Sequence, residues 1–579
     1  MNNHFKQVNQ RGKLFACLFS LVLLLLLGRV MVLQLAEAAD LLEKAEAVWV
    51  DAVALPAERG MLLDRNGEKL AYDKPAYTVT ATLSPEADVY VEDVFDTASK
   101  LASVLDVSPL ELQRQLSKEA YEVEIRPGGY KVNAETAEAV KALQLPGISV
   151  REETRRFYPN ERTASHVLGY VDLDGQAQMG LEAYYDEWLT GVPGVRQFSR
   201  DRRGVQLPEG ELQYTPSRDG DSLVLTLDLN IQSFVEEALD EVVEQYQPKA
   251  AMAIVADPSN GEILAMADRP DFNPNAYWEI TNFNNLNVSS QFEPGSTFKI
   301  VTLSAAVESG LFHPQERYSS GTYRVPGKVI RDHNNGQGWG EITFLEGVQR
   351  SSNVAFTILG ERLGKEKLFQ TIRDFGFGEP TGIDLPGEES GKILPVEEAY
   401  PLDVAAASFG QGVSVTPIQQ IAAVSAVANG GIWHTPHLVS ARVADSGQLK
   451  KVDFPPARRV IMEETAEEVR RILESVVTQG GGAPAYLEGY RVAGKTGTAQ
   501  KYDQSGSIVQ DENIVSFIGF APADHPRLIA YVAIDAPQVE GEAFGSTVAA
   551  PVFREIMRNS LHYLRIPQEG ASLPVPRPE

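Results

Sequence analysis

A serine and a lysine three positions apart open an apolar segment of the chain, within FEPGSTFKIVT at residues 292–302. Pro294 and Gly295 end the preceding segment, and the residues after them predict a helix with one buried face. Ser296 lies in the first turn of this helix, and Lys299 shares its side because residues i and i+3 are neighbours on a helix. The pair is either a helix cap with a solvated lysine or a nucleophile with its base.

The second interpretation requires an uncharged lysine, because serine attacks only after a base has removed its proton. The ordinary lysine pKa of about 10.4 falls when the amine is buried or lies near positive charge. Phe298, Ile300 and Val301 are apolar neighbours that exclude water from Lys299. A helix N-terminus and a second lysine would lower its pKa further.

The stretch QRSSNVAFTIL supplies a second polar motif, Ser351-Ser352-Asn353. The Ser351 hydroxyl is suited to relay a proton between Lys299 and a leaving amine. Asn353 offers both a donor and an acceptor to a peptide amide. The alternative is that Ser351 only caps the helix that follows.

A third motif, Lys495-Thr496-Gly497-Thr498, lies on a predicted strand in VAGKTGTAQ. Lys495, Thr496 and Thr498 supply cationic and hydroxyl donors for a substrate carboxylate, and we expect Gly497 to let a substrate backbone approach. The backbone N–H groups of Ser296 and Thr498 would form an oxyanion hole. The alternative is a Lys-Thr-Gly turn without chemistry.

The elements that must bring these motifs together are strands at the two ends of one region. The stretch 252–268 predicts two strands around a turn, and strands return at 490–500, 513–522 and 527–537. Helical patterns dominate between them, from Thr297 to about Val427. This order predicts an α+β domain whose antiparallel sheet is closed by distant segments.

The part of the chain before this domain predicts a smaller, strand-rich module. Residues 59–73 read as a hairpin around Asn66-Gly67, and residues 77–83 read as a further strand. Helices are expected within 91–119 and 133–144. The hydrophilic stretch 206–221 is interpreted as a hinge between the two parts.

Residues 14–35 are nearly all apolar, and about 20 such residues cross the hydrocarbon core of a bilayer. Basic residues precede this segment and acidic residues follow it: Lys6, Arg11 and Lys13, then Glu37, Asp40 and Glu43. This asymmetry predicts a single-pass anchor with a cytoplasmic N-terminus. The competing interpretation is a signal peptide cleaved near Ala36-Glu37-Ala38, although the apolar run exceeds the usual signal core.

Composition excludes several classes of function. The chain has 579 residues and a formal charge of −27, which argues against nucleic-acid binding. Its only cysteine is Cys17, in the apolar run, so zinc sites built from cysteine are excluded. The eight histidines are scattered, and we expect neither a metal nor a cofactor.

In this order, Ser296-x-x-Lys299, Ser351-x-Asn353 and Lys495-Thr496-Gly497 resemble the motif set of penicillin-binding proteins and class A β-lactamases. Longer stretches are similar to the class B penicillin-binding proteins, the membrane-anchored D,D-transpeptidases that cross-link peptidoglycan: RGMLLDRNGEKLA, YPNERTASHVLGYV, GLEAYYDEWLTG, SFGQGVSVTPIQ and VAGKTGTAQ. The wording of FEPGSTFKI and RSSNVAF resembles the division and sporulation branch of Gram-positive bacteria.

The resemblance implies a transmembrane helix, a strand-rich pedestal of the dimerisation type, and a penicillin-binding/β-lactamase-like transpeptidase domain with a helical subdomain. The expected boundaries are a cytoplasmic tail at 1–13, a transmembrane helix at 14–35, a pedestal at 36–220, a transpeptidase domain at 221–565 and a Pro-rich tail at 566–579.

The resemblance also implies the reaction. Ser296 is acylated by the penultimate D-Ala carbonyl of a stem peptide, the terminal D-Ala leaves, and an amine of a neighbouring stem resolves the ester. β-Lactams mimic D-Ala-D-Ala and trap Ser296. Division proteins and a membrane glycan polymerase are the expected partners.

Two other functions remain open at this stage. One is a related acyl-serine enzyme, a D-Ala carboxypeptidase or a β-lactamase, which deacylates by hydrolysis. The other is a non-enzymatic division scaffold or β-lactam sensor. Rapid hydrolysis of the acyl-enzyme would distinguish a hydrolase from a transpeptidase. Growth of cells that carry Ser296→Ala tests the non-enzymatic role.

Overall fold

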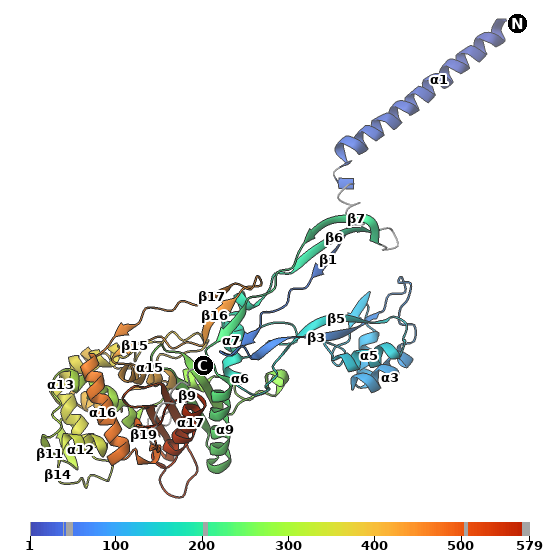
Figure 1. Ribbon diagram of the computed structural model, residues 1–579. Coiled ribbons are helices and arrows are strands. Elements are labelled where there is room, and N and C mark those ends of the chain that lie inside the picture. Colours follow the sequence, from blue (N-terminus) through green and yellow to red (C-terminus); the bar gives the residue numbers. More distant parts are fainter. Residues whose placement is uncertain (1, 39, 42–49, 201–205, 503–507, 570–579) are drawn as a thin grey trace, which may run out of the picture. The chain divides into compact units, whose positions relative to one another are not determined.

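The computed structural model describes residues 2–38, 40–41, 50–200, 206–502 and 508–569. These residues form two compact units (Figure 1). One unit contains Met1–Glu58 and Gly191–Gly220, and the other contains Arg59–Thr190 and Asp221–Glu579. Most of the predicted Pro-rich tail, residues 570–579, lies outside the described residues.

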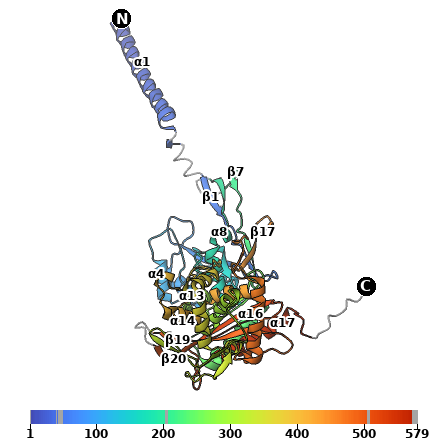
Figure 2. The same ribbon diagram turned by 90° about the vertical axis from the view of Figure 1, so that its left-hand side faces the viewer.

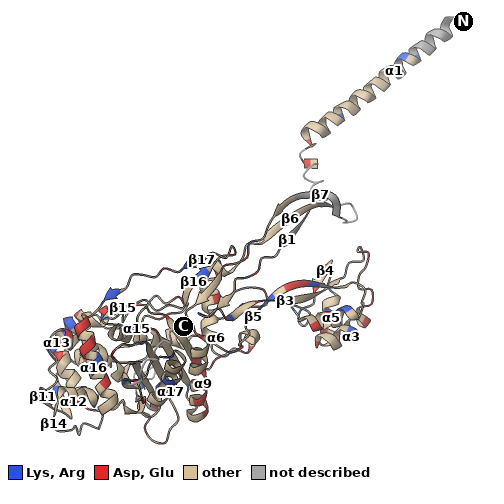
Figure 3. Ribbon diagram, viewed as in Figure 1, with Lys and Arg blue, Asp and Glu red and all other residues tan. Residues whose placement is uncertain are grey.

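The smaller unit begins with α1 (Asn2–Met31), which continues into the π-turn η1 (Val32–Ala36). The stretch Arg11–Ala36 is long and apolar enough to cross a membrane, and none of it is buried against other parts of the protein. Residues 14–28 carry no charged side chain and appear as an uninterrupted tan helix in Figure 3. Arg29, near the C-terminal end of α1, pairs with Glu37 at 2.9 Å. The predicted apolar helix is therefore confirmed.

The same unit contains a three-stranded antiparallel sheet in the order β1-β6-β7. Its strands are β1 (Val50–Leu55), β6 (Gly194–Arg200) and β7 (Gln206–Thr215). The hinge expected at 206–221 is therefore wrong over most of its length. Strand β7 forms because β6 pairs with its backbone, a non-local interaction that a hydrophilic sequence does not reveal.

Strand β3 (Lys69–Thr82) organises the N-terminal part of the larger unit. The second strand of the predicted hairpin at 59–73 and the separate strand predicted at 77–83 form one continuous strand in the structure. This strand pairs with β5 along ten residues. The remaining elements of this part are β2 (Leu62–Leu63), α3 (Val94–Leu105), α4 (Pro109–Leu116), β4 (Glu122–Glu124), α5 (Ala134–Ala142), β5 (Ile148–Phe157), α6 (Ser165–Leu168), α7 (Gly180–Tyr184) and α8 (Asp186–Leu189). The helices α3, α4 and α5 enclose a small core with Val79 and Ala81 of β3.

The C-terminal part is built on a five-stranded antiparallel sheet in the order β10-β9-β21-β20-β19. Its strands are β9 (Ala250–Ala256), β10 (Ile263–Arg269), β19 (Ala493–Tyr502), β20 (Ile508–Ala521) and β21 (Leu528–Asp535). Strands from both ends of this region therefore meet in one sheet, as the sequence predicts. The α+β class is likewise confirmed.

Both faces of this sheet are buried, which explains why β9 is apolar throughout and β21 is apolar up to its last residue. In β9, Met252 and Ile254 contact one core, whereas Ala251 and Val255 contact the other. The second core also contains α9 (Leu229–Tyr246), which is capped by the Asp228 side chain, and α17 (Ala549–Tyr563).

The first core contains the helices between the two sets of strands. They are α10 (Leu286–Ser289), α11 (Lys299–Glu308), α12 (Phe344–Gln349), α13 (Asn353–Asp374), α14 (Pro401–Ser408), α15 (Pro417–Ala428) and α16 (Glu463–Gln479). Short strands accompany them: β11 (Arg317–Ser319), β12 (Thr322–Val325), β13 (Lys328–Arg331), β14 (Glu341–Thr343), β15 (Ile432–Trp433), β16 (Val439–Val443), β17 (Leu449–Lys451) and β18 (Arg458–Arg459). Helix α16 packs beside the edge strand β19 (Figure 2).

The two parts of the larger unit share one sheet and one core. Strand β2 pairs in parallel with β8 (Ser222–Leu225), with Leu62 opposite Leu223. The first core includes Tyr158 and Leu181 from the N-terminal part together with Phe272 from the C-terminal part. The chain segments on either side of residues 191–220 are therefore packed as one body.

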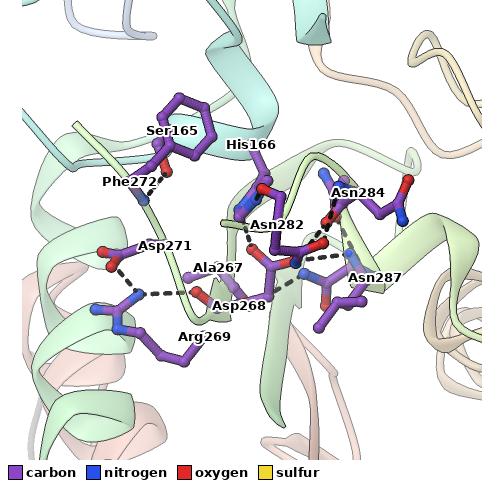
Figure 4. A network of polar contacts seen from close by, with 12 residues as sticks. Ser165, His166, Ala267, Asp268, Arg269, Asp271, Phe272, Asn282, Asn284 and Asn287 are labelled. Carbon is purple, nitrogen blue, oxygen red and sulfur yellow. Dashed lines mark hydrogen bonds and ion pairs between the residues drawn. The ribbon is translucent and has the colours of Figure 1, made fainter. Parts of the chain in front are cut away.

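A buried polar network joins these parts at His166 of α6 (Figure 4). His166 Nδ1 lies 2.7 Å from Asp268 Oδ1, and the two side chains are 3% and 2% exposed. His166 Nε2 lies 3.1 Å from the Asn282 carbonyl oxygen. Burial alone lowers the pKa of His166, but the hydrogen bond and charge of Asp268 outweigh this and raise it above the ordinary value.

We predict that His166 makes the stability of the fold depend on pH. A histidine with a raised folded-state pKa stabilises the fold fully below the ordinary histidine pKa, and this contribution is lost as pH rises through the folded-state pKa. The difference in melting temperature between the wild type and His166→Gln should therefore be larger at about pH 5.5 than at about pH 9.

The control is His525→Gln, because His525 is exposed. Its effect on the melting temperature should be small at both pH values. If the difference in melting temperature between the wild type and His166→Gln stays constant with pH, the ion pair between His166 and Asp268 is contradicted.

Candidate active site

The three motifs meet around one cavity of about 430 Å³ in the larger unit. Of the predicted site residues, its lining includes Ser296, Ser351, Asn353, Lys495, Thr496, Gly497 and Thr498. Lys299 is the remaining one, and it lies buried directly behind Ser351. The structure thus brings all the predicted site residues together.

Ser296 lies in the 3₁₀ turn η3 (Gly295–Phe298), which leads directly into α11. Gly295 adopts a φ of +56° in the left-handed region. A Cβ atom at this position would lie 2.7 Å from the Thr498 carbonyl oxygen and 3.5 Å from the Thr498 nitrogen. The glycine therefore allows the backbone before Ser296 to approach the backbone of β19 at Thr498.

Lys299 contacts the second motif through its amine. Lys299 Nζ lies 2.7 Å from the Ser351 carbonyl oxygen, 2.8 Å from Asn353 Oδ1 and 3.2 Å from Ser351 Oγ. An uncharged amine has two N–H groups, which would serve the two closer oxygens, and one lone pair, which would remain free to accept a proton. The geometry is therefore compatible with a neutral base.

The electrostatic environment of Lys299 favours the neutral form. Its side chain is 1% exposed. Burial and the nearby charge of Lys495 hold the pKa of Lys299 well below the ordinary lysine value, while the charge of Asp332 acts in the opposite direction. Both of the expected causes, desolvation and a second lysine, are present.

Ser351 is held in an unusual backbone conformation, with a φ of +57°. Non-glycine residues rarely adopt this region, and such strain persists only where surrounding contacts enforce it. Ser351 lies between the end of α12 and the start of α13, and Ser352 caps α13 by accepting a hydrogen bond from the Ala355 N–H at 3.1 Å. The helix cap is therefore Ser352, which leaves the Ser351 hydroxyl at the cavity.

Strand β19 forms one wall of the cavity. Lys495 is 1% exposed, and burial lowers its pKa to about 7. Its Nζ donates to the Thr496 carbonyl oxygen at 3.0 Å. Among the described residues, its hydrogen bonds are to the two oxygens of Thr496, so the charged form of this amine is well placed to bind a carboxylate that enters the cavity.

Gly497 also has a structural reason to be glycine. A Cβ atom here would lie 2.4 Å from Ser516 Oγ, 3.0 Å from Thr297 Cγ2 and 3.1 Å from the Pro294 carbonyl oxygen. These atoms belong to the neighbouring strand and to the segment around Ser296. Glycine is therefore needed for close packing of β19 against the Ser296 turn, and its role in substrate approach stays a prediction.

Sequence reasoning misses several stretches of the wall, and two of them precede or follow elements already described. His333 and Asn335 follow β13, and Glu542, Phe544 and Gly545 precede α17. Both stretches lie in loops, where no periodic pattern signals a site. The polar run Asp332-His333-Asn334-Asn335 directly after an apolar strand is the one local signal that marks the first stretch.

We predict that Gly497→Ala destabilises the protein by about 1–3 kcal/mol, the usual effect of overpacking a filled interior. The matched control is Gly481→Ala, because a Cβ there first meets the Gln349 carbonyl oxygen at 4.0 Å. The free energy of unfolding, measured by chemical denaturation, should change little for the control. Equal stabilities of the two variants would contradict the packing explanation.

Comparison with known proteins agrees with this geometry. The model of the penicillin-binding protein transpeptidase domain matches residues 251–558, and that of the penicillin-binding protein dimerisation domain matches residues 54–225. The chain is 44% identical to stage V sporulation protein D of Bacillus subtilis over 561 residues, which covers 96% of this chain and 86% of that protein. It is 32% identical to the peptidoglycan D,D-transpeptidase FtsI of Escherichia coli, over 97% of this chain and 93% of that protein.

Solved structures show the same similarity. Penicillin-binding protein 3 of Mycobacterium tuberculosis in complex with aztreonam is 28% identical and gives a TM-score of 0.69, covering 89% of this chain and 98% of that chain. The chain therefore belongs to the class B penicillin-binding proteins of the division and sporulation type.

Proposed function

We propose that this protein is a serine-type peptidoglycan D,D-transpeptidase that forms an acyl-enzyme at Ser296. The observation that carries the proposal is the buried amine of Lys299, whose pKa is lowered and which contacts Ser351 beside the cavity. The same cavity contains the hydroxyl of Ser296. A base and a nucleophile that share a water-poor site are the requirement for acyl transfer.

In the first half-reaction, neutral Lys299 takes the proton of Ser296 Oγ, which attacks the penultimate D-Ala carbonyl carbon of a stem peptide. The bond to the terminal D-Ala breaks, and the leaving amine receives a proton that Ser351 relays from Lys299. In the second half-reaction, an amine of a neighbouring stem attacks the ester. This step forms the cross-link and restores the Ser296 hydroxyl.

The other site residues bind the substrate. Lys495, Thr496 and Thr498 would hold the carboxylate of the terminal D-Ala, whose charge would keep Lys495 protonated. The backbone N–H groups of Ser296 and Thr498 would stabilise the oxyanion, which is supported by the close approach of Gly295 to Thr498. Asn353, which contacts Lys299, would orient the peptide amide.

The rest of the chain would present this site outside the membrane. We propose residues 14–35 as a single-pass anchor with residues 1–13 in the cytoplasm, residues 36–220 as the pedestal and residues 221–565 as the transpeptidase domain. Basic residues before the apolar helix and acidic residues after it support this orientation. Cross-linking needs newly made glycan, so a membrane glycan polymerase and division proteins are the proposed partners.

The test is mass spectrometry of the protein after reaction with a penicillin. We expect one covalent adduct on the peptide that contains Ser296, because ring opening leaves an ester with no departing group. Ser296→Ala should carry no adduct, and Lys299→Ala should form it at least about a hundredfold more slowly, the usual scale of acid–base assistance.

Unchanged labelling of Ser296→Ala would refute the assignment of the nucleophile. Rapid hydrolysis of the adduct over many turnovers would instead favour a β-lactamase. Full support of growth by Ser296→Ala, under conditions that require the wild-type protein, would favour a scaffold.

A further inference from the structure

We infer that Asp332 is a positioning residue of the acylation site, whose buried carboxylate fixes the Ser351–Asn353 segment against Lys299. The inference rests on the proposed acyl-serine chemistry and adds a residue that no sequence motif marks. Asp332 does not line the cavity, so it acts through its neighbours.

The contacts of Asp332 join two separate segments of the chain. Its side chain is buried, with the residue 2% exposed. Oδ1 accepts hydrogen bonds from Ser352 Oγ at 2.8 Å and from the Val354 N–H at 3.1 Å. Oδ2 accepts from the Gly321 N–H at 2.8 Å. The carboxylate therefore ties the first turn of α13 to the β12–β13 hairpin.

Asp332 and the residue before it hold Ser352 and Asn353, the two residues that follow Ser351 in the motif. Ser352 donates to Asp332 and at the same time caps α13. Asn353 Nδ2 donates to the carbonyl oxygen of Arg331, the residue before Asp332, at 3.0 Å. Ser351, with its left-handed backbone, immediately precedes this doubly anchored pair. The contacts of Asp332 with Ser352 and Val354 therefore help to hold Ser351 in its strained backbone conformation.

The restrained segment supplies every polar contact described above for the Lys299 amine. Those contacts are to the Ser351 carbonyl oxygen, Ser351 Oγ and Asn353 Oδ1. If the first turn of α13 moved, the amine would lose the groups that hold it beside the cavity. Loosening Asp332 should thus slow acylation even though Ser296 and Lys299 remain in place.

The charge of Asp332 gives this role a signature that a purely structural residue would lack. The charged and titratable groups that face Lys299 are Lys495 of β19, Asp332 and the nearby His333, and Tyr318 also faces Asp332. Of these, Lys495 lowers the pKa of Lys299 and Asp332 raises it. Removing the negative charge should therefore lower that pKa further and move the acid limb of the acylation profile to lower pH.

The experiment measures the second-order rate constant of acylation by a fluorescent penicillin, from about pH 5 to about pH 9, on the full-length protein in detergent. The variant is Asp332→Asn, which keeps the shape of the side chain but turns one hydrogen-bond acceptor into a donor. We expect its plateau rate to fall by about tenfold or more, the usual effect of an unpaired buried polar contact, and its acid limb to lie at lower pH.

The matched control is Asp384→Asn. Asp384 is equally buried and also accepts backbone N–H groups, from Leu438 and Val439 at 2.7 and 2.9 Å, but it does not line the cavity. This variant should lose stability and keep the wild-type plateau rate and acid limb. A slow Asp384→Asn variant would overturn the inference by showing that any buried carboxylate has the same effect.

Melting temperatures establish whether each variant folds. If Asp332→Asn does not fold, Ser352→Ala decides the question, because it removes one contact to Asp332 and keeps the charge. We expect Ser352→Ala to acylate about threefold or more slowly with an unmoved acid limb. A wild-type rate in this variant would overturn the inference.

Two results with Asp332→Asn would likewise overturn it: a plateau rate within about twofold of the wild type, or a slower rate with an unmoved acid limb. Absence of labelling in the wild-type protein is a separate outcome, because it contradicts the proposed function itself. The inference concerns only the ratio of variant to wild-type rates.

Discussion

The chemistry of this protein depends on the burial of one amine. Lys299 is almost fully enclosed, and a second buried lysine, Lys495, lies close enough to affect its pKa. In water both amines would be charged, and a charged Lys299 has no capacity to accept the Ser296 proton. Desolvation and the nearby charge of Lys495 favour the neutral form of Lys299, and oxygens of Ser351 and Asn353 lie in contact with its amine.

The rest of the structure serves to keep three segments together around this amine. The sheet provides β19, whose Gly497 lets the turn around Ser296 pack closely. The helices between the strands provide α11 and the start of α13. The edge strand β19 of this sheet packs against both α16 and the Ser296 turn. A shift of any one segment would separate base, nucleophile and carboxylate-binding lysine.

Local chemistry explains how much the sequence predicts. Ser296, Lys299, Ser351 and Lys495 are recognisable because their spacing and neighbours match a reaction, and the strands around 252–268 and 490–537 are recognisable from apolar patterns. Asp332, Glu542 and Phe544 are missed because loops bring them to the site through tertiary packing. Strand β7 is missed because pairing with β6, and not its own hydrophobicity, forms it. The packing reason for Gly497 is missed because sequence does not reveal which face of β19 meets the Ser296 turn.

The central claim is that the folded protein holds the pKa of Lys299 well below the ordinary lysine value. The most direct measurement is an NMR titration of the Lys299 side chain in protein labelled with ¹³C-lysine, with the resonance assigned by its loss in Lys299→Met. The account predicts that the resonance titrates at a pH well below the ordinary lysine pKa of about 10.4. A resonance that titrates near the ordinary value, in a protein that retains its fold, would contradict the account.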